Sequence, residues 1–151
     1  WVALRDLKDS EQPIFVFANT HFDHRGREAR LKSAQLIRDR FERIPEETPV
    51  IIVGDFNTTS RRAPYACLVC EGEETRPLID SYAAIHAKPS KNEATFSAWR
   101  NRREGERIDW VLHSQHFNTL NAGIDYTQEE GRNPSDHYPV WANLRLRPND
   151  Q

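Results

Sequence analysis

Four short polar segments of the sequence carry side chains that could form a reactive site. They read NTHFDH (residues 19–24), GDFN (54–57), RID (107–109) and SDHYPV (135–140). Each stands beside a run of apolar residues of the kind that forms a buried strand. Side chains at the ends of rigid strands are held in fixed positions, and binding sites are commonly built from them. The candidate residues are His21, Asp55, Asn57, Asp109, Asp136 and His137.

These residue types suit the hydrolysis of a phosphate ester. Carboxylates and an amide oxygen are ligands that a hard cation such as Mg²⁺ prefers. Histidine can hydrogen-bond a phosphate or act as an acid or a base, and an aspartate such as Asp109 behind His137 would fix its tautomer. With a metal, such a set neutralises charge on the phosphoryl oxygens. The sequence has no P-loop or dinucleotide-binding glycine motif that would indicate another chemistry.

Each segment also has a purely structural interpretation when it is taken alone. GDFN consists largely of turn-forming residues, His21 could be a hydrogen-bonded structural histidine, and Asp136 could cap a turn or a helix. Asp109 differs because it lies inside a predicted strand, and a buried carboxylate needs a partner. His137 would supply one. The agreement of four separate segments favours one shared site.

The apolar patterns predict a layered α/β or α+β fold. Residues 27–44 repeat apolar side chains every three or four positions, which indicates an amphipathic helix, and residues 63–69 fit a second, shorter helix. Residues 71–107 are polar and are expected to form irregular loops. Strands are predicted over residues 1–7, 14–18, 50–53, 108–112, 120–126 and 140–146, with the first two joined as a hairpin.

Length and composition describe one globular domain. The chain has 151 residues, including four Trp, seven Phe and four Tyr, which supply large buried areas. The formal net charge of −2 provides no global field that would attract a polyanion. A phosphate-bearing substrate would have to be held locally, by a metal or by a few arginines. No apolar run approaches the length that spans a membrane.

Cys67 and Cys70 form a CxxC pair. On the predicted helix they are interpreted as small hydrophobic residues one turn apart. A redox motif would instead need its thiols at a helix start after a strand. A zinc site would need two further ligands, for which His113 and His116 are the available pair.

Taken in order, NTHFDH, GDFN, RIDWVL and SDHYPV resemble the motifs of the endonuclease/exonuclease/phosphatase family, which includes the deoxyribonuclease-like and apurinic-site nucleases. The resemblance extends over about residues 1–146. It implies a metal-dependent hydrolase of phosphate esters, either a phosphodiesterase or nuclease or a phosphatase, that uses Mg²⁺ or alternatively Mn²⁺. It also implies one sheet-plus-helices layer of a four-layer α/β/β/α sandwich, with a mixed and mostly antiparallel sheet.

The resemblance assigns expected catalytic roles to five residues. His21 would contact the phosphate, and Asp55 would orient or activate the attacking water. Asn57 would hold that water or a phosphoryl oxygen. Asp109 would orient His137, which would contact the scissile phosphate or transfer a proton. Which residue acts as the general base stays open.

The expected metal site departs from the family pattern. Asp136 would contact the metal, with Asp55 and Asn57 as further candidate ligands. Family members also carry a first half with its own sheet, an asparagine and a metal-binding glutamate, none of which this sequence matches. We therefore expect residues 1–147 to form the C-terminal half of such a domain, followed by a tail at 148–151. The alternative is a catalytically incomplete fragment that acts only as a binding or structural half.

Two expectations concern partners and substrate. An apolar sheet face would have to be covered by the missing half or by a second copy of the chain. Arg100, Arg102, Arg103 and Arg107 form a basic cluster, either a solvated loop or a phosphate-facing rim. Phe96 and Trp99 either stack on a base or sugar or pack the loop. Nucleic acid, a phospholipid head group and a sugar phosphate remain open as substrates.

Overall fold

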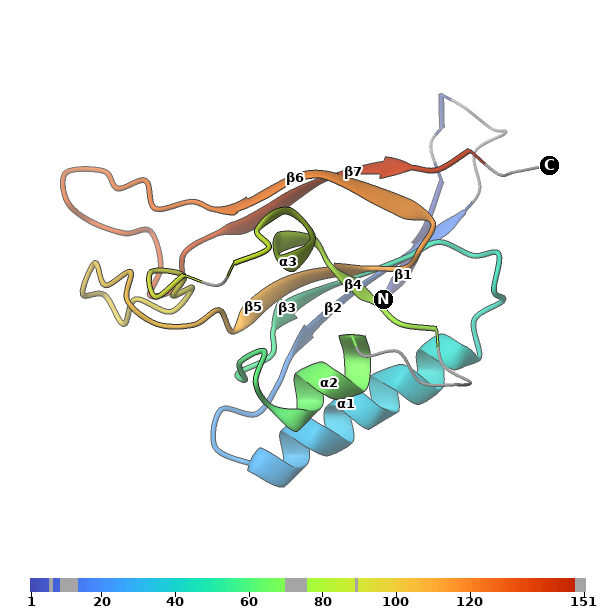
Figure 1. The fold of residues 1–151 in the computed structure, drawn as a ribbon, viewed down its shortest axis with the longest axis horizontal. Coiled ribbons are helices and arrows are strands. Elements are labelled where there is room, and N and C mark those ends of the chain that lie inside the picture. The colour runs from blue at the N-terminus through green and yellow to red at the C-terminus, as the bar shows by residue number, and fades with distance from the viewer. Residues whose placement is uncertain (6, 9–13, 70–75, 89, 149–151) are drawn as a thin grey trace.

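The computed structural model describes residues 1–5, 7–8, 14–69, 76–88 and 90–148, which form the α/β fold that the sequence predicts. In Figure 1, α1 and α2 lie side by side beneath the main sheet, and the β6–β7 pair lies on its other side. The elements are β1 (Val2–Leu4), β2 (Phe15–His21), α1 (Arg27–Glu42), β3 (Val50–Asp55), α2 (Ala63–Val69), β4 (Ile79–Asp80), α3 (Ser81–Ile85), β5 (Asp109–His113), β6 (Phe117–Ile124) and β7 (Val140–Leu146).

The five-stranded sheet has the order β1-β2-β3-β5-β4. Its β2 and β3 run parallel, with α1 as the crossover between them, and the other pairings are antiparallel. This confirms the mixed and mostly antiparallel sheet. Because β2 and β3 are parallel, their carboxyl ends meet at one edge, where the amino end of antiparallel β5 also lies.

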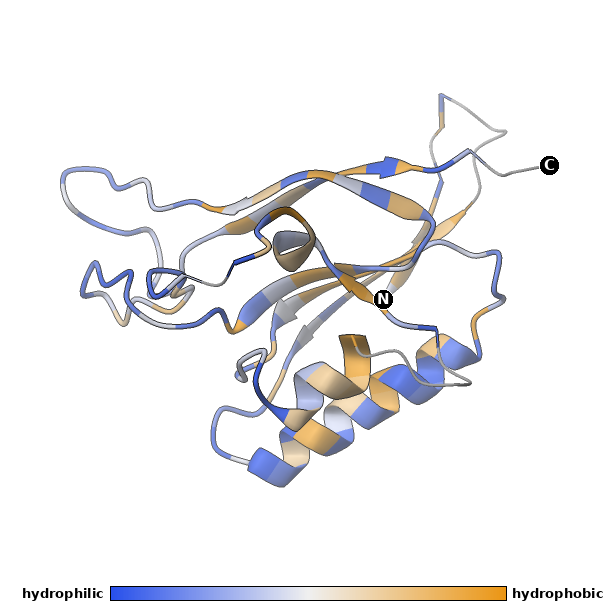
Figure 2. Ribbon diagram, in the orientation of Figure 1, coloured by the Kyte–Doolittle hydropathy of each residue, from blue (hydrophilic) through white to orange (hydrophobic). Residues whose placement is uncertain are grey.

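The core forms where the two helices meet the sheet. Ala34 and Phe41 recur on one side of α1 and are buried, as the amphipathic pattern predicts. Phe56 is fully buried and stacks on Trp110 at a centroid distance of 4.5 Å. Figure 2 shows the hydrophobic residues in α1, α2 and the central strands. The aromatic stack fixes the segment after β3 against β5, which is where the candidate site begins.

The predicted irregular stretch at residues 71–107 is wrong in part, because it contains β4 and α3. Asp80 ends β4 and caps α3, since its side chain accepts hydrogen bonds from the backbone N–H groups of Tyr82 and Ala83. The same carboxylate forms a buried ion pair with Arg107, at 2.9 Å from Nη2 to Oδ2. These tertiary contacts stabilise two short elements that have no periodic sequence pattern.

Several strand boundaries differ from prediction. β2 and β3 continue to His21 and Asp55, so both polar residues are the last members of paired strands and do not follow them. β6 begins at Phe117, ahead of the predicted start, whereas the predicted strand at Val140–Leu146 is confirmed. β6 and β7 pair with each other in a separate sheet. α3 lies between this pair and β5 in Figure 1.

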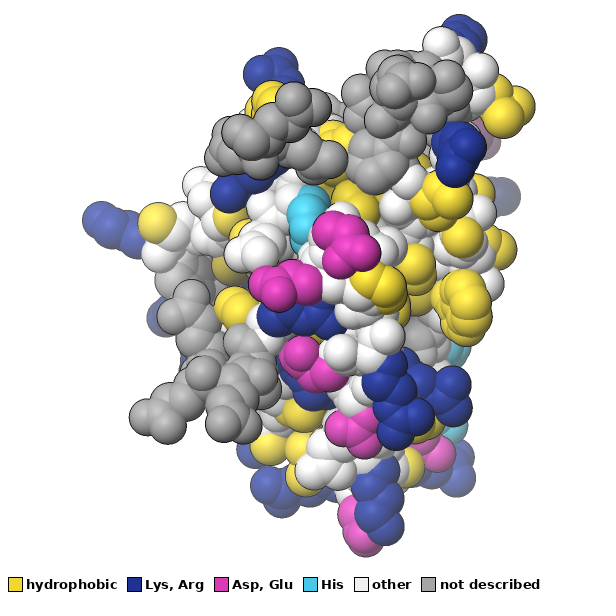
Figure 3. All heavy atoms as spheres, turned by 90° about the vertical axis from the view of Figure 1, so that its right-hand side faces the viewer, with side chains coloured by type: hydrophobic (Ala, Val, Ile, Leu, Met, Phe, Trp, Pro, Cys, Tyr) yellow, Lys and Arg dark blue, Asp and Glu magenta, His cyan; other side chains and the backbone are white. Residues whose placement is uncertain are grey.

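Exposed hydrophobic residues gather on the edge of the main sheet. Trp1, Val2 and Leu4 on and beside β1, and Ile14 just before β2, are all exposed. Figure 3 shows hydrophobic side chains along one side of the molecule, above a band of basic and acidic side chains. Within the described residues, no helix has the length and apolarity needed to cross a membrane.

Candidate active site

The first part of the site is the shared end of β2 and β3. His21 and Asp55 are partners in the parallel register, and His21 Nε2 lies 3.2 Å from Asp55 Oδ2. Gly54, one residue earlier, has φ +146°. A Cβ atom there would lie 1.9 Å from the Thr20 carbonyl oxygen. Glycine is therefore what allows β2 to approach closely enough for the histidine and the carboxylate to meet.

Asn57 turns back onto Asp55 in a left-handed conformation with φ +47°. Its backbone N–H donates to Asp55 Oδ1 at 2.8 Å, and its side-chain Nδ2 donates to Asp55 Oδ2 at 3.0 Å. The same Nδ2 also donates to the Phe22 carbonyl oxygen at 2.9 Å. Asparagine tolerates this backbone conformation better than most residues do. The two side chains are thus held as one unit.

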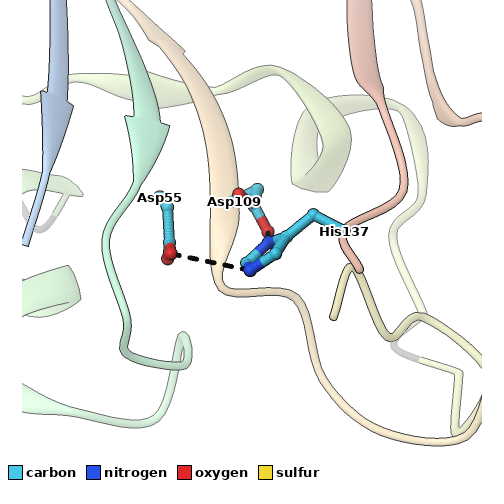
Figure 4. A group of neighbouring side chains, drawn as sticks. All are labelled: Asp55, Asp109 and His137. Atoms are coloured by element: carbon cyan, nitrogen blue, oxygen red, sulfur yellow. Dashed lines mark hydrogen bonds and ion pairs between the residues drawn. The ribbon is translucent and has the colours of Figure 1, made fainter. Parts of the chain in front are cut away.

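The second part of the site is an aspartate–histidine couple. His137 Nδ1 lies 2.9 Å from Asp109 Oδ2, and Nε2 on the other side of the ring lies 3.8 Å from Asp55 Oδ2. Figure 4 shows the imidazole between the two carboxylates. One ligand atom from each of these three residues lies within 4.8 Å of the others, so the group could hold a metal ion. Asp109 therefore has the partner that its place in a strand requires.

Thr95 is a supporting residue that the sequence reasoning did not select. It is fully buried, and its Oγ1 accepts hydrogen bonds from the backbone N–H groups of Ile108 and Asp109 at 3.0 and 3.2 Å. Its carbonyl oxygen accepts from Tyr138 N at 2.7 Å. One residue thus connects the backbone of the acid to the backbone beside His137. A threonine in a polar stretch gives no sequence signal for this role.

The electrostatics of the site concentrate on Asp55. Burial is the largest effect and raises the pKa of this carboxyl, and the negative charge of Asp109 raises it further. The hydrogen bond from Asn57 N and the nearby imidazoles of His137 and His21 act in the opposite direction without reversing the shift. Asp55 is therefore a stronger base than an ordinary aspartate, and a nearby positive charge would stabilise its ionised form.

The structure does not bring every predicted residue into this group. The Asp136 carboxylate accepts a hydrogen bond from Ser135 Oγ at 3.3 Å and is not a member of the cluster of three metal-ligand side chains. The backbone carbonyl oxygen of Asp136 accepts hydrogen bonds from Ser97 N at 2.7 Å and from Ser97 Oγ at 3.0 Å. Among the described contacts, the Asp136 backbone thus anchors a neighbouring loop, and a metal contact by its carboxylate stays a prediction.

Arg107 does not belong to the basic cluster that the sequence suggested. Its guanidinium donates to both carboxylate oxygens of Asp80, at 3.1 and 2.9 Å, and lies over the Tyr82 ring. Both charged groups of this pair are buried. Arg107 is therefore neither a solvated loop residue nor a phosphate-facing one, whereas Arg100 and Arg102 are exposed.

The cysteine and histidine residues of the zinc alternative have other contacts. Cys67 packs half-buried against the core, and burial raises the pKa of its thiol. His113 is buried and hydrogen-bonds through both ring nitrogens, to Ser114 O and Thr119 Oγ1. Cys70 lies outside the described residues. In the part of the chain that the structure covers, Cys67 belongs to no group of metal-ligand side chains.

Comparison with known proteins agrees with this fold. Residues 2–137 match the model of the Endonuclease/Exonuclease/phosphatase family. The chain therefore belongs to this family, whose members are hydrolases of phosphate esters.

Individual proteins similar to the chain include a phosphatase. Nocturnin of Drosophila melanogaster is 26% identical over 181 aligned residues, which cover 97% of this chain and 28% of that protein. A mannosyl-6-phosphatase of Bacteroides thetaiotaomicron superposes with a TM-score of 0.72 at 29% identity, over 89% of this chain and 52% of that one. Zebrafish (D. rerio) TDP2 complexed with single-stranded DNA product shares the fold, with a TM-score of 0.64 at 16% identity over 85% of this chain and 55% of that one. The chain thus spans about half the length of these solved structures.

Proposed function

We propose that this chain carries the catalytic groups of a metal-dependent hydrolase of phosphate esters. The observation that supports this proposal most directly is the close approach of Asp55, Asp109 and His137, with one ligand atom of each within 4.8 Å of the others. Two carboxylates on either side of an imidazole supply acid, base and cation-binding groups in one place. Family membership supports the same class of reaction.

The donor set fits a hard divalent cation, Mg²⁺ or alternatively Mn²⁺. Asp55 and Asn57 would hold it through side-chain oxygens, with the Asp136 carboxylate as a further expected ligand. Burial and the charge of Asp109 raise the pKa of Asp55, and a cation bound here would favour the ionised carboxylate. When bound, the cation supplies positive charge that stabilises the phosphoryl oxygens in the transition state.

The side chains of the site would orient the phosphate and the attacking water. Asp109 holds Nδ1 of His137, so the imidazole presents Nε2 toward Asp55 and toward a phosphate bound beside it. Asp55 orients the attacking water, and Asn57 holds this carboxylate in place. His21, exposed at the end of β2, contacts the phosphate from the other side. The general base is either Asp55 or His137.

A second candidate function is a binding or structural half without turnover. Its support is that the chain spans about half of the solved structures that it matches. The exposed hydrophobic residues of β1, Val2 and Leu4, fit a sheet that is covered by another segment or by a second copy. Under this proposal residues 1–147 are the C-terminal half of the family's domain, and residues 148–151 are a tail.

Hydrolysis assays of the purified chain decide between these functions. We expect release of phosphate or alcohol from a phosphate monoester or diester when Mg²⁺ or Mn²⁺ is added, and loss of this activity in EDTA. Asp55→Asn and His137→Ala should each lower turnover by orders of magnitude, whereas His24→Ala, which changes an exposed histidine of the same motif region, should not. Metal-stimulated turnover that survives Asp55→Asn would overturn the proposed site. Absence of turnover, with folding intact, would favour the structural half.

A further inference from the structure

A small cavity adjoins Asp109, the acid of the Asp109–His137 couple. Its volume is about 10 Å³, and residues of α3, β5 and the β6–β7 pair line it. Ser81, Arg107 and Asp109 bring polar side chains to this lining. A polar cavity of this size holds about one water molecule.

The Ser81 hydroxyl needs a partner that this cavity can supply. Ser81 is fully buried, and within the described part of the chain its hydroxyl has no hydrogen-bond partner. A buried hydroxyl that makes no hydrogen bond costs free energy, so such groups usually bond to an ordered water. The Asp80 carboxylate caps α3 and fixes its first residue, Ser81, in this place. A water in the cavity would satisfy the hydroxyl without any change in the helix.

Asp109 and Arg107 complete the set of partners for a water. Oδ2 of Asp109 is bonded to His137 Nδ1 at 2.9 Å, whereas none of the described hydrogen bonds involves Oδ1. An ionised carboxylate can accept hydrogen bonds on both oxygens. The Arg107 guanidinium donates to Asp80 through Nη1 and Nη2 and has further N–H groups. Three polar groups therefore line the cavity, within the roughly two to four that a buried water needs.

The β6–β7 pair covers one side of the cavity. Gly123 and Trp141 are partners in the register of this pair, and a Cβ on Gly123 would lie 2.7 Å from Trp141 Cζ2. The indole therefore packs directly on the glycine backbone, which only a residue without a side chain allows. In Figure 1, α3 lies between this pair and β5. Hydrogen bonds in such an enclosed place are electrostatically stronger than in bulk water.

We propose that one ordered water in this cavity joins the Ser81 hydroxyl to Oδ1 of Asp109, so that Ser81 is a positioning residue for the Asp109–His137 couple. The water donates to the carboxylate, accepts from an Arg107 N–H group and forms its remaining hydrogen bond with Ser81. The carboxylate is then held from both of its oxygens, which keeps Oδ2 directed at His137 Nδ1. The inference rests on the proposed function, because the couple that Ser81 supports belongs to that site.

A crystal structure of the wild-type chain tests the bridge without any assay of turnover. At a resolution that shows ordered waters, we expect one water within about 3 Å of both Ser81 Oγ and Asp109 Oδ1. A cavity that holds no water, or a direct hydrogen bond from the Ser81 hydroxyl to another protein group, overturns the proposal. This result is decisive even if a variant at position 81 does not fold.

The proton on His137 Nδ1 reports on the couple in solution. Its NMR resonance is assigned by its loss in His137→Ala. Ser81→Ala weakens the hydrogen bonding of Asp109 Oδ1, so the carboxylate becomes a stronger acceptor for this proton and the resonance should move downfield. An unchanged resonance in a folded Ser81→Ala variant overturns the positioning role.

Ser114→Ala is the matched control for both stability and the resonance. Ser114 is also a buried serine, but it follows the opposite end of β5 from Asp109, and its Oγ accepts a hydrogen bond from Val50 N at 2.9 Å. Ser114→Ala should lower Tm, because Val50 N loses its partner, and should leave the His137 proton where it is in the wild type. A shift as large as that of Ser81→Ala would show a general effect of removing a buried hydroxyl and would overturn the assignment to Ser81.

Kinetics separate positioning from a purely structural role. Ser81→Ala should lower kcat by roughly two- to tenfold with KM unchanged, which is the effect of losing one hydrogen bond. Asp109→Asn and the double variant Ser81→Ala/Asp109→Asn should be equally slow, because Ser81 acts only through Asp109. A Ser81→Ala variant with a raised Tm and wild-type turnover overturns the proposal, since the hydroxyl would then be only an unsatisfied buried group.

The two proposals fail in different ways. If the water and the shift of the His137 proton are found while no phosphate ester is hydrolysed, the hydrolase proposal fails and the bridge stands. If metal-dependent hydrolysis is found without the water and without any effect of Ser81→Ala, the hydrolase stands and the bridge fails.

Discussion

Substitution of Gly54 by alanine tests how closely β2 and β3 must approach for the site to form. Gly54 has φ +146°, and an added Cβ would lie 1.9 Å from the backbone oxygen of Thr20. Ordinary contacts of a Cβ begin at 3.4 Å, so the Cβ and the oxygen would have to move about 1.5 Å further apart. The neighbouring atom is backbone and cannot rotate away. The backbone of β2 and β3 must therefore shift.

The cost follows from two effects. A Cβ at positive φ costs about 1–2 kcal/mol, and two ladder hydrogen bonds lost through the separation cost about 1 kcal/mol each. The sum is about 3–4 kcal/mol, out of a typical stability of about 5–15 kcal/mol. For a domain of this size it corresponds to a fall in Tm of roughly 6–16 °C. Because His21 and Asp55 face each other at the next register position, hydrolysis should fall together with stability.

Thermal unfolding followed by circular dichroism measures this effect, with Gly131→Ala as the matched control. Gly131 also has a positive φ, +75°, but a Cβ there would meet no atom within 4 Å. The Gly131→Ala variant should lose only the part of the unfolding free energy that a Cβ costs at positive φ, about 1–2 kcal/mol. Equal destabilisation by the two substitutions would refute the reasoning, because the backbone clash at Gly54 would then contribute nothing.

Three further predictions follow from the site and its surroundings. Because the pKa of Asp55 is raised in the folded chain, protonation of this carboxyl favours folding. The stabilisation is fully present below the ordinary aspartate pKa and is lost as the pH rises through the raised pKa of the folded state. Asp55→Asn should therefore raise Tm at neutral pH, with a gain of about 0.5–2 kcal/mol, and melting curves that show a loss would contradict this. Asp109→Asn and His137→Ala should each lower kcat by about 10²–10⁴, and the double variant no further, since they act as one unit; multiplicative losses in steady-state kinetics would argue against the couple. Arg107→Ala should cost about 3–5 kcal/mol in urea unfolding because a buried carboxylate loses its partner, whereas Arg100→Ala should stay within about 0.5 kcal/mol.

The sequence predicted the elements that have long periodic patterns. The helix expected over residues 27–44 is observed as Arg27–Glu42, and the alternating strand at Val140–Leu146 has the predicted bounds. Patterns of this kind record which side of an element is buried. β4 and α3 escaped prediction because a two-residue strand and a five-residue helix are too short for any periodicity. Their stability comes from the contacts of Asp80, which only the folded chain brings together.

The residue types of the candidate site could be predicted from the sequence, but the residues that hold them in position could not. An abrupt change from apolar to polar residues marks all five. His21, Asp55 and Asp109 are terminal residues of strands, and Asn57 and His137 lie two and three residues from a strand. The residues that position them have no such mark, because a threonine at position 95 resembles any loop residue until its hydrogen bonds are known.

The sequence also could not show which arginines of the predicted basic cluster are buried. Arg107 and Arg100 look alike in the sequence, yet one is buried on Asp80 and the other is exposed. The difference depends on which neighbour the fold places beside each side chain.

The contacts of Thr95 have a consequence for motion. Its side-chain oxygen is bonded to the backbone of Asp109, its carbonyl oxygen to the residue after His137, and its own chain continues into the loop of Trp99. The backbone of Asp109, the segment of His137 and the loop that follows position 95 are thus connected through one buried residue, Thr95. We therefore expect a displacement of the loop to be transmitted through these hydrogen bonds to the segment of His137.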